Sequence, residues 1–340
     1  MIDPIALARA LIDIPSPSGE EEAVGEFLHT TLSRMRFGVR RHAAGGRFNL
    51  FAEAGGRARV ILNSHMDTVP PWIASREDDD NLYGRGACDT KGVIAAMLAA
   101  GERLCQRGVR DFAFLFVVGE ETDSIGAKSA NRELAGIRSE FVIVGEPTES
   151  KFARASKGAL TAFLRFEGVA AHSAYPERGD SAIRKMMAAI REIESADWGS
   201  DALLGGTTVN VGVVRGGEKP NIVPPSAECE LMFRTAGDPE AVQAKLDTLV
   251  RRFGGRITLA RGNPPQFMLV PDGAPSWIVA FNTDVPHLGN LGRPLLFGPG
   301  SILDAHGAAE RIAKRDLIAA VDIYCNTVLA LLEGRVARTR

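Results

Sequence analysis

Histidines and carboxylic acids follow several apolar, β-prone segments of the sequence at the point where each segment ends. His65 and Asp67 come after RVILNS, Glu120 and Glu121 follow FAFLFVV after one glycine, and Glu146 follows FVIV in the same way. Because residues i and i+2 of a strand share a face, Asp67 can hold the His65 ring as a metal ligand requires. Neighbouring Glu120 and Glu121 point different ways, so one can bind a cation while the other faces a bound water. The strand ends therefore predict a site for divalent cations.

Two further segments offer ligands of the same kind. Asp89 stands in the glycine-rich run YGRGACDTKG, directly ahead of a predicted helix, and His306 ends the run GPGSILDAH. An Asp before a helix is an N-cap on one interpretation, and on another it bridges two cations. Two histidines and three carboxylates form the mixed nitrogen and oxygen ligand set that suits Zn²⁺.

The elements that must position these side chains alternate between helix and strand in the first 150 residues. Apolar runs predict strands at 48–53, 59–64, 112–118 and 141–144, and a helix at 91–106. Such alternation is typical of an α/β domain with helices flanking a sheet. After residue 267 the same pattern returns, with the strand PLLFG and a helix from Asp316 to Glu333.

The middle of the chain has a different order of elements, β-α-β-β-α-β, with strands such as LTAFLRFEG and AECELMFR. This order predicts a compact two-layer unit. An α/β domain interrupted by an inserted domain explains the whole pattern. We expect residues 1–157 to form the first part of the α/β domain, 158–266 the insert, and 267–340 the second part.

Composition limits the partners of this chain. Its 340 residues are 45% apolar and 24% charged, with a net charge of −2 and both signs interspersed. Neither a nucleic acid nor a membrane surface is expected, so the predicted partner is a small molecule. No apolar run reaches membrane-spanning length, and the start MIDPIALARALIDIP lacks the features of a secretion signal. We expect a cytoplasmic protein with reduced thiols, because its four cysteines are well separated: Cys88, Cys105, Cys229 and Cys325.

Six segments, HMDTV, GRGACDTKG, GEE, GEPT, AAHSAYPERG and GPGSILDAH, occur in this order across nearly the whole chain. They resemble the metallopeptidase and deacylase family that includes acetylornithine deacetylase, succinyl-diaminopimelate desuccinylase and glutamate carboxypeptidase, with the acetylornithine deacetylase-like members most similar. The resemblance implies a zinc-exopeptidase-like, three-layer α/β/α catalytic domain with an inserted ferredoxin-like lid or dimerisation domain. It also implies two divalent cations, Zn²⁺ before Co²⁺ or Mn²⁺, and a homodimer formed through the insert.

The resemblance assigns the ligands residue by residue. It implies that His65 and Glu146 hold one cation, that Glu121 and His306 hold the other, and that Asp89 bridges the two. The chain departs from the family pattern after His306, where it reads GAAE instead of a Thr-Pro pair before the Glu. We therefore expect His306 as a ligand in a loop of altered shape.

The resemblance also assigns roles in catalysis and substrate binding. Asp67 would orient His65, and Glu120 would be the general base that moves a proton from water to the leaving amine. His172, in AAHSAYP, would stabilise the oxyanion from the same or the partner subunit. The positions that match substrate contacts are Asn221, Arg234, whose guanidinium suits an α-carboxylate, and Thr283.

These assignments favour metal-dependent hydrolysis of a small N-acyl amino acid, of the acetylornithine deacetylase type, in amino-acid metabolism. A dipeptidase or carboxypeptidase would use the same metal site, and a further alternative is release of an amino acid from a carrier protein. No GxSxG motif is present, so an acyl-enzyme on a serine is disfavoured. A binding protein that has lost catalysis should lack ligands or the base, whereas this chain retains all of them.

Overall fold

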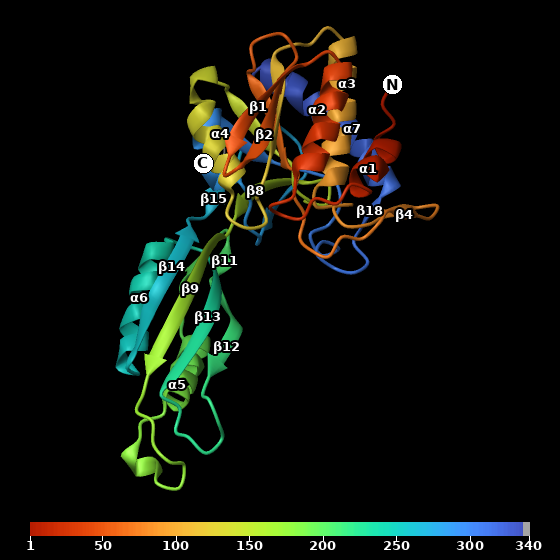
Figure 1. The fold of residues 1–340 in the computed structure, drawn as a ribbon. Helices are drawn as coiled ribbons and strands as arrows, with labels where there is room; N and C mark the ends of the chain where they lie inside the picture. The colour runs from red at the N-terminus through yellow and green to blue at the C-terminus, as the bar shows by residue number, and fades with distance from the viewer. Residues whose placement is uncertain (336–340) are drawn as a thin grey trace. The chain divides into compact units, whose positions relative to one another are not determined.

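A mixed nine-stranded sheet carries the strands whose ends hold the candidate ligands (Figure 1). The computed structural model describes residues 1–335. The sheet order is β1-β2-β6-β3-β7-β17-β8-β15, with β16 paired to β8. Strands β6, β3, β7 and β17 are parallel, so their carboxyl ends lie along one edge. The strands are β1 (Gly38–Ala44), β2 (Arg47–Glu53), β3 (Val60–His65), β6 (Phe112–Val117), β7 (Phe141–Val144), β8 (Phe152–Ser156), β15 (Gln266–Phe267), β16 (Ser276–Val279) and β17 (Arg293–Leu296).

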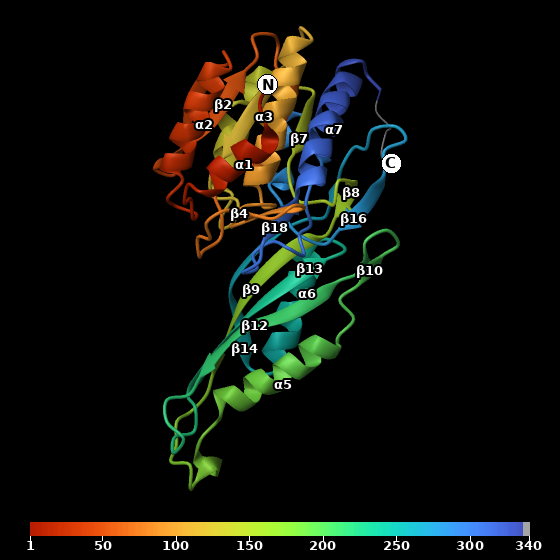
Figure 2. The same ribbon diagram turned by 90° about the vertical axis from the view of Figure 1, so that its right-hand side faces the viewer.

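Helices cover both faces of this sheet, as the sequence predicts. The adjacent residues Leu50 and Asn49 of β2 point to opposite faces. Leu50 belongs to the core formed with α1 (Pro4–Ile12), α2 (Glu22–Arg34), α3 (Lys91–Gln106) and α7 (Lys314–Leu332). The Asn49 side chain instead donates to the Gly126 carbonyl of α4 (Ile125–Glu133) at 2.8 Å. Figure 2 shows α1, α3 and α7 side by side, and the three-layer α/β/α arrangement is confirmed.

Small residues let α3 lie close against the sheet. Its first eleven residues, KGVIAAMLAAG, are all buried. A Cβ added to Gly101 would lie 2.3 Å from the Phe114 ring of β6, so the helix needs glycine at this point. Since α3 begins two residues after Asp89, its close packing fixes the position of the loop that carries this carboxylate.

The inserted segment forms its own sheet and core. Its elements follow the predicted β-α-β-β-α-β order, and its sheet has the ferredoxin-like order β12-β13-β9-β14 with every pair antiparallel. Alternate residues of β13 are buried under the helices α5 and α6. The elements are β9 (Gly158–Glu167), α5 (Ala182–Ser195), β12 (Thr208–Gly216), β13 (Ser226–Thr235), α6 (Pro239–Arg252) and β14 (Gly255–Asn263).

The chain clusters into two compact units. Unit 1 comprises Met1–Arg154, Phe267–Trp277 and the described chain from Thr283 onward, and unit 2 comprises Ala155–Gln266 and Ile278–Asn282. Unit 1 also has a three-stranded sheet of β18 (Arg311–Ala313), β5 (Asn81–Tyr83) and β4 (Arg76–Glu77). A short hairpin of β10 (Ser200–Asp201) and β11 (Gly205–Gly206) belongs to unit 2. Each unit therefore supplies its own framework for the candidate residues that it carries.

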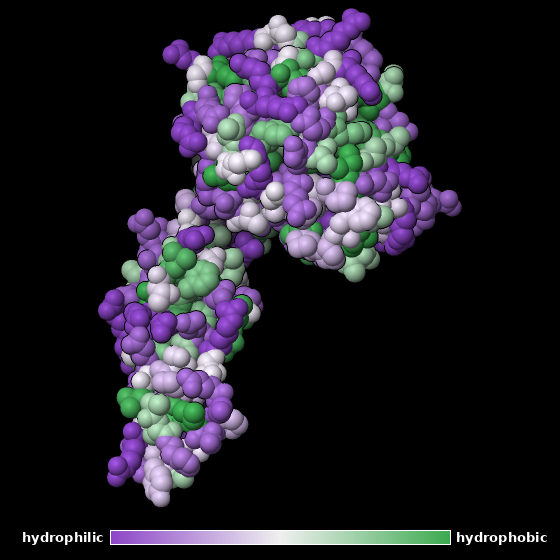
Figure 3. All heavy atoms as spheres, viewed as in Figure 1, coloured by the Kyte–Doolittle hydropathy of each residue, from purple (hydrophilic) through white to green (hydrophobic). Residues whose placement is uncertain are grey.

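Apolar side chains are concentrated in the two cores. Among residues 1–335, no helix combines the length and the apolarity that crossing a bilayer requires. Hydrophilic residues dominate the face of each unit drawn in Figure 3, and the apolar residues visible there are scattered. All four cysteines are free thiols, and three of them are buried.

Candidate metal centre

The parallel strands bring the predicted ligands to one edge of the main sheet. His65 is the last residue of β3, and the neighbouring strands β6 and β7 end shortly before Glu121 and Glu146. Asp89 reaches the same edge from the loop before α3, and His306 from the loop between β17 and β18. The five side chains converge because the carboxyl ends of adjacent parallel strands meet at one edge.

Asp89 lies between two halves of this centre. Its Oδ1 is 3.0 Å from His65 Nε2, and its Oδ2 is 3.3 Å from His306 Nε2. His65 Nε2 is also 3.9 Å from Glu146 Oε2, while His306 Nε2 is 3.1 Å from Glu121 Oε1. One oxygen of the buried Asp89 carboxylate therefore faces the His65 half and the other faces the His306 half.

Asp67 supports this centre in two ways. Its backbone carbonyl lies 2.9 Å from His65 Nδ1, whereas the nearer carboxylate oxygen is 3.6 Å away. The carboxylate accepts the backbone N–H groups of Glu120 and Glu121 at 3.1 and 3.2 Å, and the Ser18 hydroxyl at 2.7 Å. The expected orientation of His65 is thus made mainly through the Asp67 backbone, and the carboxylate instead fixes the turn that carries the paired acids.

The centre has three carboxylates and two histidines, so its acids outnumber its bases. Among the described residues, Asp89, Glu121 and Glu146 form ion pairs with histidines and with no Lys or Arg. Burial raises the pKa of Glu146, the neighbouring carboxylates add to the rise, and His65 opposes it. Hydrogen bonds to Asp89 and Glu121 raise the pKa of His306 to about 10. A proton on His306 thus supplies part of the positive charge that offsets the neighbouring carboxylates.

The residues present fit divalent cations. Ligand atoms of His65, Asp89 and Glu121 all lie within 4.8 Å of one another. Histidine nitrogens and carboxylate oxygens are borderline to hard donors, as Zn²⁺, Co²⁺ and Mn²⁺ accept. With Glu146 and His306, the set offers enough donors for two ions that share Asp89.

Glu120 stands beside the centre without joining its contacts. In the described chain its carboxylate forms no hydrogen bond or ion pair, while its backbone N–H is held by Asp67. Burial raises the pKa of Glu120 well above its ordinary value, His65 opposes the rise, and Asp284 and Glu121 add to it. A raised pKa suits a carboxyl group that must both accept and return a proton.

Asp284 is a residue of this site that the sequence did not reveal. Its carboxylate is 2% exposed, and its Oδ1 has no hydrogen-bond partner among residues 1–335. Burial raises the pKa of Asp284 to about 6, against a hydrogen bond from Ser124. The available signal is an acid directly beside Thr283 in the segment AFNTDVPHL. The preceding residue, Thr283, which the resemblance assigns to a substrate contact, is also buried. Its hydroxyl oxygen accepts the Val285 N–H at 3.2 Å.

Unit 2 brings two further predicted residues together and keeps a third apart. His172 pairs with Ile222 in an isolated bridge, and the Asn221 carbonyl accepts the Ser173 N–H, so His172 and Asn221 lie side by side. The exposed His172 ring accepts the Ala174 N–H at Nδ1, at 3.1 Å, which leaves the ring proton on Nε2.

Arg234 lies at the other end of the same sheet. It pairs with Ala159 at the start of β9, whereas the segments of His172 and Asn221 follow the end of β9 and precede the start of β13. No carboxylate among the described residues pairs with Arg234, and burial lowers its pKa. Arg234 is thus a partly buried cation without an ion-pair partner among residues 1–335.

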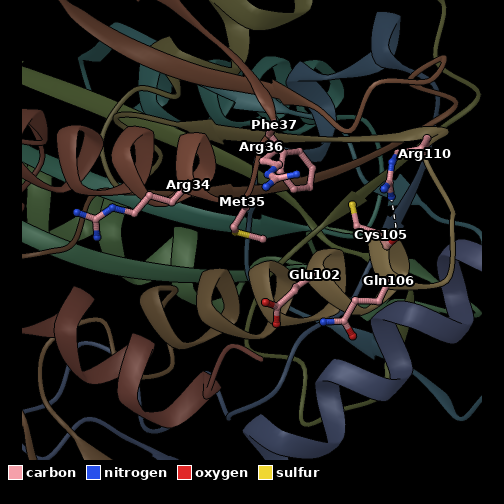
Figure 4. A pocket seen from close by; sticks show the side chains of 8 residues that line it. All are labelled: Arg34, Met35, Arg36, Phe37, Glu102, Cys105, Gln106 and Arg110. Carbon is pink, nitrogen blue, oxygen red and sulfur yellow. Dashed lines mark hydrogen bonds between the residues drawn. The ribbon is translucent and has the colours of Figure 1, made fainter.

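A pocket of about 320 Å³ lies away from the candidate centre (Figure 4). It is lined from the carboxyl ends of α2 and α3, whereas the centre adjoins the amino end of α3. None of the candidate residues lines it. The lining residues are Arg34, Met35, Arg36, Phe37, Glu102, Cys105, Gln106 and Arg110.

Comparison with known proteins finds peptidase-family matches in both units. A family model described as a peptidase dimerisation domain matches residues 154–257, and one described as peptidase family M28 matches residues 49–149. The chain is 33% identical over 337 residues to a peptidase M20 domain-containing protein of Schizosaccharomyces pombe, covering 96% of this chain and 84% of that protein. A probable carboxypeptidase of Emericella nidulans is 33% identical over 381 residues, with coverages of 97% and 89%.

A solved structure has the same fold. The structure of a tripeptidase from Staphylococcus aureus matches this one with a TM-score of 0.79 at 23% identity, covering 97% of this chain and 99% of that chain. The inserted domain and the α/β domain therefore occur together in a protein of nearly the same extent.

Proposed function

The chain belongs to the M20 peptidase family, and we propose that it hydrolyses the amide bond of a small amino-acid-derived substrate with the help of two divalent cations. The observation that carries this proposal is the position of Asp89, whose two carboxylate oxygens face separate histidines at 3.0 and 3.3 Å. A bridging carboxylate between two ligand sets is the arrangement that a two-metal hydrolytic site requires.

The ligands divide around Asp89. His65 and Glu146 would hold one ion, Glu121 and His306 would hold the other, and Zn²⁺ suits this set best. When bound, the two ions would polarise the amide carbonyl and lower the pKa of a water molecule to near neutrality. A nucleophilic side chain is then unnecessary.

Glu120 would move the proton. Its carboxylate is free of protein partners in the described chain and is placed by the Asp67 contact to its backbone. It would take a proton from the attacking water and return it to the amide nitrogen, so that the leaving amine departs neutral. The pKa of Glu120, which burial raises, supports this role, because the carboxyl group must hold the proton before it returns it.

His172 would stabilise the oxyanion that forms on the carbonyl oxygen. Its Nδ1 accepts the Ala174 N–H, so its Nε2–H is the donor that such a role requires. Asn221, which lies beside it, can add a second polar contact.

Arg234 would bind the α-carboxylate of the substrate through its guanidinium, which forms no ion pair in the part of the chain that the structure describes. At least eight residues of β13 separate it from the His172 segment, or about 26 Å at 3.3 Å per residue. One amino-acid-sized substrate cannot span that distance. We therefore propose that His172 and Arg234 at one site come from different subunits of a homodimer, which the match to a peptidase dimerisation domain supports.

Two substrate classes fit this site. An N-acyl amino acid, as in acetylornithine deacetylase-like proteins, presents an amide and an α-carboxylate, and it is the substrate that the six sequence motifs favour. A dipeptide or the carboxyl end of a peptide presents the same two groups. The peptide substrate is supported equally well, because the Emericella nidulans relative is named a probable carboxypeptidase.

The proposal is tested by amine release from N-acetyl and N-succinyl amino acids and dipeptides, with zinc-loaded protein and a chelated control. Chelator-sensitive cleavage of N-acyl amino acids supports the deacylase, and cleavage of dipeptides alone replaces it with the peptidase. Release that is unaffected by the chelator, or no release from any substrate, would contradict metal-dependent amide hydrolysis.

A further inference from the structure

The buried Glu310 carboxylate organises the loop that presents Asp89. Glu310 is 1% exposed, and its Oε1 accepts the backbone N–H groups of Gly86, Cys88 and Asp89 at 2.9, 3.3 and 3.3 Å. In the part of the chain that the structure describes, the Cys88 and Asp89 amides have no other acceptor. The backbone at the bridging carboxylate is thus fixed by a side chain distant in sequence.

Arg85 extends the same network to the loop that presents His306. Its Nη1 donates to Glu310 Oε2 at 2.6 Å, in an ion pair whose two side chains are at most 2% exposed. The guanidinium also reaches the carbonyl oxygens of His306 and Gly307 at 3.3 and 3.4 Å. His306 has a φ of 62°, an unusual backbone conformation for a residue other than glycine, and the Arg85 contact helps to hold it.

The network therefore joins two ligand-bearing loops beside the point where β5 and β18 pair. Asp89 lies in the loop before α3, and His306 lies between β17 and β18. Glu310 stands four residues after His306, so a single short segment supplies a ligand and the carboxylate that fixes its neighbour. This segment is where the sequence departs from the Thr-Pro pattern of the family, yet the structure retains the Glu at its end.

We infer that Glu310 and Arg85 are positioning residues that set the separation of Asp89 and His306, and so the affinity for the ion held by Glu121 and His306. The inference rests on the proposed two-metal function. It explains why a charged pair is buried here, since an ion pair gives little net stability when its desolvation is counted but defines geometry well. The His65 half has its own support from Asp67 and depends less on the pair.

The test is zinc binding to the metal-free full-length chain, measured by calorimetry and by metal analysis. Groups that hold metal ligands in place typically contribute about 10- to 100-fold to affinity. Glu310→Gln should therefore keep one tight site and weaken the second by at least about tenfold. Glu140→Gln is the control, because it alters a different arginine-paired carboxylate, bound to Arg59 at 2.7 and 3.0 Å, that touches neither ligand loop.

Arg85→Lys provides a second variant that preserves the buried charge pair if Glu310→Gln does not fold. A lysine has no second nitrogen to reach the His306 carbonyl while it pairs with Glu310, so the second site should again weaken. In activity assays at limiting zinc, kcat of both variants should fall while KM changes less. High zinc should restore part of kcat. Two sites of wild-type affinity in a folded variant would overturn the inference, whereas a wild-type chain that binds no zinc would contradict the proposed function itself.

Discussion

Replacement of Glu120 by Gln separates proton transfer from metal binding. The substitution preserves the shape of the side chain and the hydrogen bond from the Glu120 backbone N–H to Asp67. The Glu120 carboxylate itself has no hydrogen-bond or ion-pair partner in the described chain. Folding and zinc content should therefore stay unchanged. Loss of a general base lowers the rate by about 10²- to 10⁴-fold. This corresponds to about 3 to 5 kcal/mol of added barrier at 1.36 kcal/mol per tenfold.

The assay pairs amine release at saturating substrate with zinc analysis of the same sample. Glu121→Gln is the matched control, because it changes the adjacent acid, whose carboxylate lies 3.1 Å from His306 Nε2 and would bind a cation. The control should lose zinc and activity together, whereas Glu120→Gln should lose activity alone. Activity within tenfold of the wild type, or zinc loss in Glu120→Gln, would refute the assigned role.

The remaining predictions concern other parts of the account. Zinc binding near pH 7 should release protons, because His65 and His306 have raised pKa values without metal and must become neutral ligands, and affinity should fall as the pH falls; calorimetry in buffers of different ionisation enthalpy measures this. Mixed dimers of His172→Ala and Glu120→Gln subunits should regain about a quarter of wild-type activity if His172 acts across a symmetric dimer, and no recovery would place it in the same subunit. Burial lowers the pKa of His287 from 6.5 to about 4, so the unfolded chain binds more protons between these pH values and stability decreases as the pH is lowered from 6.5 to 4. His287→Gln should remove about 1 to 2 kcal/mol of this loss after allowance for solvent screening, and equal urea midpoints for both chains across pH 4 to 6.5 would contradict it. Phe114→Ala should cost about 3 to 5 kcal/mol in urea unfolding, because its ring is fully buried against Phe112 and Gly101; a loss below 1 kcal/mol would show that the core collapses around the gap.

Much of the fold could be predicted because its strands are apolar and their ends are polar. The expected strand at 141–144 and helix at 91–106 have the predicted bounds, and the strand expected at 59–64 lies at Val60–His65. The β1 strand, GVRRHAA, was not predicted, because its side chains are mostly exposed and its sequence lacks an apolar run. Hydrophobic periodicity predicts elements that bury one face or both, but it does not predict a mostly exposed edge strand such as β1.

The site could be predicted only as far as its residues follow recognisable segments. His65, Asp89, Glu121, Glu146 and His306 converge because three of them follow adjacent parallel strands. The contacts of Glu310 with the Asp89 loop could not be predicted, since its partners are backbone amides more than two hundred residues away. Asp284 likewise reaches the site through tertiary packing, which leaves no local pattern in the sequence.

The most direct test of the central claim is a crystal structure of the zinc-loaded protein with anomalous scattering recorded at the zinc edge. The account predicts two peaks on either side of the Asp89 carboxylate, one within bonding distance of His65 and Glu146 and the other of Glu121 and His306. A single peak, or two peaks that do not share Asp89, would contradict the proposal that this chain is a two-metal amide hydrolase.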